Sequence, residues 1–295
     1  PSVGELTRGT DVCTRNGCIP RRFGYRIDRT GCQIMQGRTI FMRANMLQKI
    51  RIFVVTVYAT LRITLIVLYK VNFRGGYPRW YGDKWLRWWA RELVDAVRIR
   101  YMVIDPHHTR IEPGKRYIVM GNHRSHYDIP LSVLAIPGSV RMLTKKELFK
   151  VPLWGKGMTA GEFISIDRHD FEQAKRDLAA ARAKMEDGIV LWIAPEGTRS
   201  RSGRMGHFKK GGFVMAIESG ATIIPMGIRG SEKVLPPKTL DFVLDQEVTI
   251  ELGAPIEASS YTLENKEELM EEVRAAIARL CGEDAEETVA EPLTL

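Results

Sequence analysis

From residue 100 onward, short apolar runs alternate with segments of helical spacing, and this alternation restricts the fold more than any other feature. Helical spacing of apolar residues covers 171–185 and 269–280. The apolar runs that predict strands are 117–120, 140–143, 164–166, 189–194, 222–228 and 248–252. Such alternation is typical of an α/β domain with a mostly parallel sheet flanked by helices. Ligands in such domains bind at loops that leave the carboxyl ends of strands, so we expect the functional residues there.

Composition narrows the class of protein. The chain has 295 residues, of which 44% are hydrophobic and 27% charged. These values exclude a disordered chain, a fibrous repeat and a polytopic membrane protein. The four cysteines are too few and too unevenly spread for a disulfide scaffold, which favours a reduced, intracellular setting. We predict a weakly ordered extension at 1–45, a membrane-associating two-helix segment at 46–100, the α/β domain at 101–281 and an acidic tail at 282–295.

An 18-residue apolar run extends from Ile52 to Tyr69. This length is close to the minimum that spans a bilayer. Arg62 interrupts the run near its middle, where a cation costs at least ~2.5 kcal/mol. The sequence therefore favours a helical hairpin that enters one leaflet without crossing it, while a single span stays open as an alternative.

A helix with two unlike faces is predicted after the Gly-Gly-Tyr-Pro turn, over 80–100. Lys84, Arg87 and Arg91 occupy its basic face. The aromatic residues supply the predicted membrane contacts, which are Trp80, Tyr81, Trp85, Trp88 and Trp89. An aromatic face opposite a basic face is typical of a helix that lies in the headgroup layer. The alternative is an ordinary helix packed on the domain, with its tryptophans in the core and its basic face in solvent.

The first part of the chain is strongly basic. Residues 1–120 carry 22 Lys and Arg against 8 Asp and Glu. A basic half indicates an anionic partner, either nucleic acid or a phospholipid surface. Nucleic-acid binding favours aromatic residues interleaved with basic ones on an exposed platform. Here the aromatic residues segregate to one helix face, so we predict an anionic membrane surface as partner and no nucleic acid.

The loop after the strand at 117–120 carries a histidine and an aspartate five residues apart, His123 and Asp128. An aspartate that accepts from one ring N–H fixes the imidazole tautomer and leaves the other nitrogen as a general base. The alternative for such a pair is a loop histidine beside an aspartate that caps a helix.

Other loops after strands carry cations. The loop at 195–200 combines a glycine turn, hydroxyls and Arg199, which suits a phosphate. Arg168 ends the segment 161–168, and Lys145 follows the strand at 140–143. Each cation alone is more often a solvated surface charge, but together they are expected at one rim of the sheet.

In this order, the motifs resemble those of the lysophospholipid acyltransferases, specifically the bacterial 1-acylglycerol-3-phosphate acyltransferases. The resemblance covers roughly residues 50–280. The N-H-x4-D motif matches Asn122, His123 and Asp128, and the segment at 145–152 also looks like the family's. The remaining matches are Gly161, Phe163, Ile164 and Arg168 for the second motif, Glu196, Gly197, Thr198, Arg199 and Ser200 for E-G-T-R-S, and Ile224 with Pro225 for the last.

The resemblance implies a fold and a reaction. The fold is the glycerolipid acyltransferase fold, and the reaction moves an acyl group from acyl-CoA or acyl carrier protein to the sn-2 hydroxyl of 1-acylglycerol 3-phosphate, giving phosphatidic acid. His123 is the implied general base and Asp128 orients it. The implied phosphate-binding residues are Arg168, Arg199, Lys145, Gly197 and Thr198, and the supporting residues are Asn122, Glu196 and Ser200.

The resemblance also implies partners and a location. The partners are a lysophospholipid acceptor, an acyl donor and an anionic membrane surface. The implied location is the cytoplasmic face of the inner (plasma) membrane. No resident cofactor and no metal are expected. No enzyme nucleophile is expected either, because a thioester is activated enough to react without one.

Three alternatives remain at this point. The first is an acyltransferase with another acceptor, such as glycerol 3-phosphate, another lysophospholipid or an ornithine-type lipid. The second is a metal-dependent hydrolase with His123, His126 and Asp128 as ligands. The third is a non-catalytic protein that binds anionic membranes.

Overall fold

A computed structural model describes residues 13–14, 17–18, 26–27, 33–34, 43–167, 170–200, 204–236 and 239–283. The chain divides into two compact units, Pro1–Ile40 and Phe41–Leu295. In the first unit, two antiparallel pairs of short strands are described, β1 (Cys13–Thr14) with β2 (Gly17–Cys18) and β3 (Arg26–Ile27) with β4 (Gln33–Ile34). The rest of the predicted extension up to residue 42, and the predicted tail after residue 283, lie outside the described residues.

The second unit is built on one sheet with the strand order β5-β11-β10-β6-β9-β7-β8, and β12 pairs beside β10. Its strands are β5 (Arg100–Ile104), β6 (Tyr117–Gly121), β7 (Ser139–Lys145), β8 (Ile164–Ile166), β9 (Ile189–Ile193), β10 (Thr222–Arg229), β11 (Glu247–Leu252) and β12 (Ile256–Glu257). From β10 to β8, all five neighbouring strands run parallel. β11 is antiparallel to β10. The mostly parallel sheet predicted from the sequence is confirmed.

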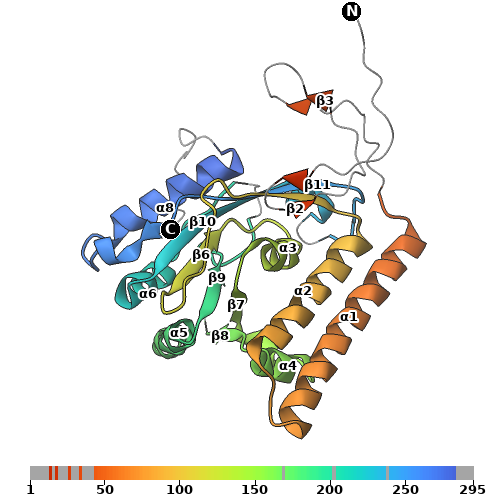
Figure 1. Cartoon of the computed structure of the whole chain (residues 1–295), viewed down its shortest axis with the longest axis horizontal. Helices are drawn as coiled ribbons and strands as arrows, with labels where there is room; N and C mark the ends of the chain where they lie inside the picture. The colour runs from red at the N-terminus through yellow and green to blue at the C-terminus, as the bar shows by residue number, and fades with distance from the viewer. Residues whose placement is uncertain are drawn as a thin grey trace, which may run out of the picture. The chain divides into compact units, whose positions relative to one another are not determined.

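Helices cover both faces of this sheet (Figure 1). Their bounds are α1 (Met46–Phe73), α2 (Arg79–Ala96), α3 (Asp128–Ala135), α4 (Trp154–Ala160), α5 (Phe171–Glu186), α6 (Gly211–Ser219), α7 (Ser231–Val234) and α8 (Lys266–Cys281), with short 3-10 turns at Lys146–Lys150 and Ala258–Ser260. In Figure 1, α5, α6 and α8 lie on one face, α3 and α2 on the other, and α1 outermost.

Side-chain alternation along the strands divides the core between these two layers. On β6, Tyr117 and Val119 point into the cluster that contains α2 and α3, whereas Ile118 and Met120 point into the cluster that contains α5, α6 and α8. Every residue of β6 and β9 is buried. Strands that are buried on both faces read as continuous apolar runs, which is why the sequence predicted them closely.

Helix α1 begins at a capping box, in which Asn45 accepts from the Gln48 N–H and the Gln48 side chain accepts from the Asn45 N–H. α1 packs on α2 and α4, while a strip of its apolar residues is exposed, including Phe53, Val54 and Leu65. In the described part of the chain, α1 is the one helix long and apolar enough to cross a membrane.

Helix α2 differs from its prediction in length and in the direction of two side chains. The helix ends at Ala96 rather than at residue 100, because Arg98 adopts a φ of 57° and the chain turns into the unpredicted strand β5. Arg87 is not a solvated cation: its guanidinium donates to the carbonyl oxygens of Val133 and Ile136 at the end of α3. Such a bond satisfies carbonyls that lack a partner within the helix.

Trp89 also departs from the predicted aromatic face. Its indole N–H donates to Thr60 Oγ1 on α1 at 3.1 Å, and its ring packs against the core. The buried stripe of α2 consists of small and aliphatic residues, including Gly82, Leu86 and Ala90. Trp80, in contrast, is 65% exposed.

Two arginines fix the start of α2 to the domain. Arg79 donates to both carboxylate oxygens of Glu162, at 2.8 and 2.9 Å. Arg141 on β7 is 2% exposed and donates to Asp83 Oδ1 at 2.7 Å and to the Gly161 carbonyl at 2.6 Å. A buried guanidinium with several fixed partners holds the local geometry, and the two-helix segment and the α/β domain form one structural unit.

Gly227 on β10 tests how tightly α8 packs on the sheet. A Cβ at this position would lie 2.5 Å from the backbone carbon of Leu280, so we expect Gly227→Ala to destabilise the fold by ~1–3 kcal/mol through overpacking. Gly212→Ala is the matched control, because its Cβ would lie 3.5 Å from Ile193 Cδ1, an ordinary contact. Thermal unfolding of both variants measures the difference, and equal melting temperatures would contradict the packing argument.

Candidate active site

The parallel register brings the predicted loops to one edge of the sheet. β6 lies between β9 and β10, with Met120 opposite Ile193 and Gly121 opposite Met226. β7 pairs with the other side of β9, and β8 with β7. The loops at 121–128 and 194–200 therefore leave adjacent strands at the same edge, as predicted, with Lys145 at the end of the next strand.

Asn122 anchors the first loop. Its side-chain amide donates to the Ile228 carbonyl and accepts from the Ile228 N–H, both at 2.8 Å, and the residue is 1% exposed. A carboxamide offers one donor and one acceptor side by side, which matches a backbone peptide group. The side chain of Asn122 thus ties the loop to β10 and fixes the backbone from which His123 projects.

Asp128 organises the turn that holds His123. Its carboxylate is completely buried, and Oδ2 accepts from the Arg124 N–H at 2.7 Å and from the Ser125 N–H at 2.8 Å. His123 Nδ1 lies 2.8 Å from the same oxygen. With Nδ1–H donating to the carboxylate, Nε2 is left as an acceptor. The alternative role of Asp128 as a helix cap is not observed, because α3 begins at Asp128 itself and the two N–H groups that it binds belong to the loop before the helix.

The loop at 194–200 is fastened to the first loop. The Ser200 N–H donates to the His123 carbonyl at 2.9 Å, and the Ser200 side chain donates to the Arg204 carbonyl. Gly197 adopts a φ of 74°, which closes a turn from its N–H to the Ala194 carbonyl. A left-handed backbone at this position favours glycine.

Glu196 is buried beneath this turn. Its carboxylate accepts from the Gly206 N–H at 2.8 Å. Burial raises the pKa of Glu196, while hydrogen bonds from the Gly206 and His123 N–H groups and the nearby charge of His123 oppose this shift. Glu196 thus connects the turn at Gly197 to the loop that contains Gly206, and the supporting role given to it stays a prediction.

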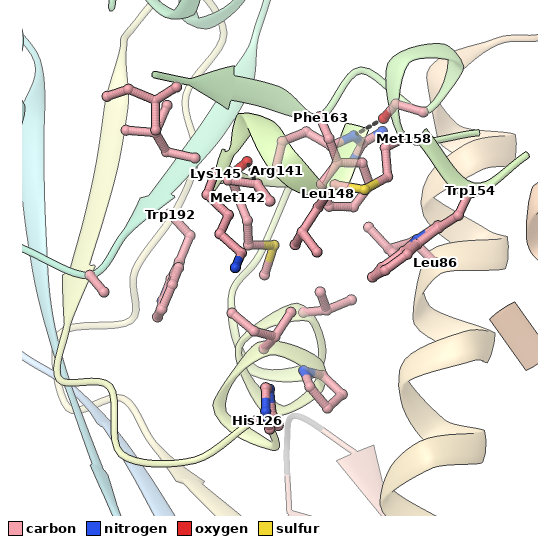
Figure 2. Close-up of a pocket in the computed structure, with 18 of the residues that line it drawn as sticks. Leu86, His126, Arg141, Met142, Lys145, Leu148, Trp154, Met158, Phe163 and Trp192 are labelled. Atoms are coloured by element: carbon pink, nitrogen blue, oxygen red, sulfur yellow. Dashed lines mark hydrogen bonds between the residues drawn. The ribbon is translucent and has the colours of Figure 1, made fainter. Parts of the chain in front are cut away.

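A large cavity of about 1270 Å³ opens beside these loops. His123, Lys145, Arg199 and the loop residues Gly197 and Thr198 line its polar part. The cavity continues between apolar side chains toward the α1–α2 pair, and Figure 2 shows Trp154 and Leu86 on that side, with His126 and Trp192 across from them. The cavity thus joins a cationic mouth to an apolar arm.

The predicted phosphate-binding residues are placed unequally. Lys145 and Arg199 line the same cavity as His123, and so does Lys209 from the loop before α6. Lys146, in contrast, is paired with Asp167 and not available for an anion. Arg168 lies outside the described residues.

The metal-dependent alternative gains no support. Burial lowers the pKa of His126, and the charges of Arg199 and His123 lower it further. His126 lines the same cavity as His123. No three His, Cys, Asp or Glu side chains converge into a group that could hold a metal, within the residues that the structure describes.

Two contacts of the site were not predicted. The ring of Trp192 on β9 packs edge-to-face against His123, with the centroids 5.7 Å apart. Arg124 pairs with Glu283, which follows α8. Alternation along β9 identifies Trp192 as facing the α3 side of the sheet, but no local pattern connects Arg124 with a residue 159 positions away.

Comparison with known proteins identifies the class. Residues 103–229 match the family model described as Acyltransferase. This match includes the first and third motifs, and the family resemblance predicted from four motifs is confirmed.

Individual relatives carry more specific names. The chain is 28% identical over 232 residues to a 1-acyl-sn-glycerol-3-phosphate acyltransferase of Haemophilus influenzae, covering 76% of this chain and 90% of that protein. It is 28% identical over 161 residues to a chloroplastic enzyme of the same name from Arabidopsis thaliana, covering 55% of this chain and 44% of the relative. The chain thus spans less than half the length of the plant protein.

A solved structure shares the fold. The 1-acyl-sn-glycerophosphate acyltransferase PlsC from Thermotoga maritima matches with a TM-score of 0.66 and 22% identity, over 84% of this chain and 98% of that one. The glycerolipid acyltransferase fold predicted from the sequence is confirmed by this match.

The raised pKa of Glu196 predicts a pH dependence of stability. The folded state holds the Glu196 proton more tightly than the unfolded state, so its contribution to stability is greatest at low pH and is lost as pH rises through the folded pKa. We expect the melting temperature of the wild type to fall relative to that of Glu196→Gln between pH 4 and pH 7. Thermal unfolding of both proteins across this range measures the difference, which a pH-independent offset would contradict.

Proposed function

We propose that the protein transfers an acyl group from acyl-CoA or acyl carrier protein to the sn-2 hydroxyl of 1-acylglycerol 3-phosphate, which gives phosphatidic acid. The observation that carries this proposal is the pairing of His123 with Asp128 inside a cavity that has a cationic mouth and an apolar arm. The names of the relatives support the choice of acceptor.

His123 acts as the general base in this mechanism. With Nδ1–H held by Asp128, Nε2 removes the proton from the sn-2 hydroxyl as its oxygen attacks the thioester carbon. The tetrahedral intermediate collapses, the C–S bond breaks, and the protonated imidazole returns its proton to the leaving thiolate. The carboxylate of Asp128 orients the ring and stabilises the imidazolium. The mechanism uses no resident cofactor.

Cations at the cavity mouth hold the acceptor. Arg199 and Lys145 bind its phosphate, assisted by the turn at Gly197 and Thr198. Arg168, which lies outside the described residues, is assigned to the same phosphate from the sequence motif alone. A fixed phosphate sets the distance between the sn-2 hydroxyl and His123, which is the main contribution that positioning makes to such a transfer. The apolar arm accepts acyl chain.

The two-helix segment attaches the enzyme to its substrates. Both the acceptor and the product are lipids, so the cavity has to open near a bilayer. The exposed apolar strip of α1 enters one leaflet, and the basic residues around it favour an anionic surface at ~1 kcal/mol per cation. We place the protein at the cytoplasmic face of the inner (plasma) membrane, inserted without crossing.

Acyl transfer from oleoyl-CoA to 1-oleoylglycerol 3-phosphate in detergent micelles tests the reaction. We expect phosphatidic acid from the wild type, and rates lower by about 10²–10⁴ for His123→Ala and Asp128→Asn because proton transfer is lost or misoriented. The carboxamide of Asp128→Asn still accepts from the Arg124 and Ser125 N–H groups, so its fold is retained. Equal activity in wild type and His123→Ala would remove His123 from the mechanism.

Parallel assays separate related activities. Glycerol 3-phosphate and lysophosphatidylcholine replace the acceptor, and oleoyl-acyl carrier protein replaces the donor. A wild-type enzyme that acylates only one of these acceptors, and not 1-oleoylglycerol 3-phosphate, would overturn the proposed substrate but not the reaction class.

Arg199 tests the phosphate site. We expect Arg199→Gln to lower kcat/KM by about 10–100-fold, mainly through the KM of the acceptor, because a charge-assisted hydrogen bond contributes ~1.5–3 kcal/mol. Arg176→Gln is the control, since this exposed guanidinium bonds to Gln173 on α5. Initial rates at varied acceptor concentration measure both, and an unchanged acceptor KM in Arg199→Gln would contradict the assignment.

A further inference from the structure

The guanidinium of Arg62, in the middle of α1, lies close to three aromatic rings. Its central carbon lies 4.7 Å from the ring centre of Trp88, 5.2 Å from that of Trp85 and 5.8 Å from that of Tyr58. Trp85 and Trp88 belong to α2 and pack edge-to-face, 5.4 Å apart. These four side chains form an aromatic–arginine cluster between the two helices.

Most hydrogen-bond donors of this arginine are unused. Arg62 donates to the Tyr58 hydroxyl at 3.0 Å, whereas a guanidinium carries five N–H donors. Within the described residues, no carboxylate lies within ion-pair distance of Arg62, and none occurs in the sequence of α1. Glu92 follows Trp88 by one helical turn on α2, but it forms no ion pair with Arg62. The cluster is thus a preformed cationic site to which the described part of the chain contributes no anion.

Apolar residues surround the cluster on α1. Val54 is 56% exposed, Leu61 45% and Leu65 55%, all within two turns of Arg62. Where this surface meets lipid, the free donors of Arg62 need a partner, because an unsatisfied charged group in hydrocarbon is costly. Phosphate oxygens are the anions that a bilayer presents at its surface.

A second cation repeats the arrangement. Lys70 lies two turns after Arg62 on α1, and its ammonium is 5.0 Å from the ring centre of Tyr81 on α2. Tyr81 packs edge-to-face on Trp85, which itself packs on Trp88. These three rings of α2 therefore contact one another, and together they contact both Arg62 and Lys70. Tryptophan and tyrosine are the residues that settle at headgroup level in membranes.

We propose that the aromatic–arginine cluster of Tyr58, Arg62, Trp85 and Trp88 is a binding site for the phosphate of an anionic phospholipid. The planar guanidinium of arginine can donate two parallel hydrogen bonds to phosphate oxygens. Its contact with the tryptophan rings leaves the remaining N–H donors available to a phosphate at the membrane surface. The site rests on the membrane association in the proposed function, but not on the acyl-transfer chemistry.

The site also fixes how deep α1 inserts. A phosphate bound at Arg62 holds the middle of the 28-residue helix at headgroup level. The helix then lies along one leaflet, with its exposed apolar strip toward the acyl chains, and does not cross the bilayer. This placement differs from a general basic attraction, in which each surface cation contributes equally.

Vesicle binding of the full chain tests the site. Vesicles of phosphatidylglycerol and phosphatidylcholine in equal amounts are compared with vesicles of phosphatidylcholine alone, and the ratio of the two affinities is the readout. We expect Arg91→Leu, an exposed arginine on the same hairpin, to lower this ratio about fivefold, as the loss of one surface cation does (~1 kcal/mol). We expect Arg62→Leu to lower it at least tenfold.

A second variant separates the fork from the charge. Arg62→Lys keeps the charge and loses the planar fork, so we expect this variant to lower the affinity ratio at least fivefold. Equal losses for Arg62→Leu and Arg91→Leu, or full retention by Arg62→Lys, would overturn the proposed site. Acyl transfer in detergent micelles is measured for each variant in parallel, so that a failure of the proposed reaction is distinguished from a failure of lipid binding.

Discussion

The buried carboxylate of Asp128 is the interaction on which the rest of the site depends. One of its oxygens holds two backbone N–H groups and the ring of His123. An unpaired charge at this depth would be strongly unfavourable, so the turn exists only while these donors surround the carboxylate. The same contact that closes the turn between β6 and α3 also sets the tautomer of the histidine, and folding and chemistry cannot be separated here.

Parallel pairing spreads this local order across the sheet. Because β6 and β9 are neighbours in register, the Ser200 N–H reaches the His123 carbonyl and joins two motifs that lie more than seventy positions apart in the chain. The carboxylate of Glu196 binds the Gly206 N–H next to this contact. Lys145, at the end of β7, lines the same cavity. The cavity follows from this geometry: its polar mouth lies where the strands end, and its apolar arm lies where the two-helix segment covers the sheet.

Much of this arrangement could be predicted from the sequence. Buried strands such as β6 and β9 appear as unbroken apolar runs, and the spacing of His123 and Asp128 indicated their contact. The roles of these residues in catalysis stay predictions. The direction of Trp89 could not be predicted, because its N–H finds Thr60 on a different helix. The cost of Arg62 inside an apolar run stays a prediction. Its aromatic surroundings depend on how α1 and α2 pack, which helical periodicity alone does not determine.

The pairing of Arg124 with Glu283 has a consequence for biosynthesis. The loop that carries His123 receives this partner from a residue that is translated 159 positions later. Chains begin to fold from the N-terminal side while they are still being made. The apolar helix α1 therefore leaves the ribosome and can meet a bilayer long before the catalytic loop is complete. Helix α1 is thus complete before the loop that carries His123 gains its partner from the C-terminal part of the chain.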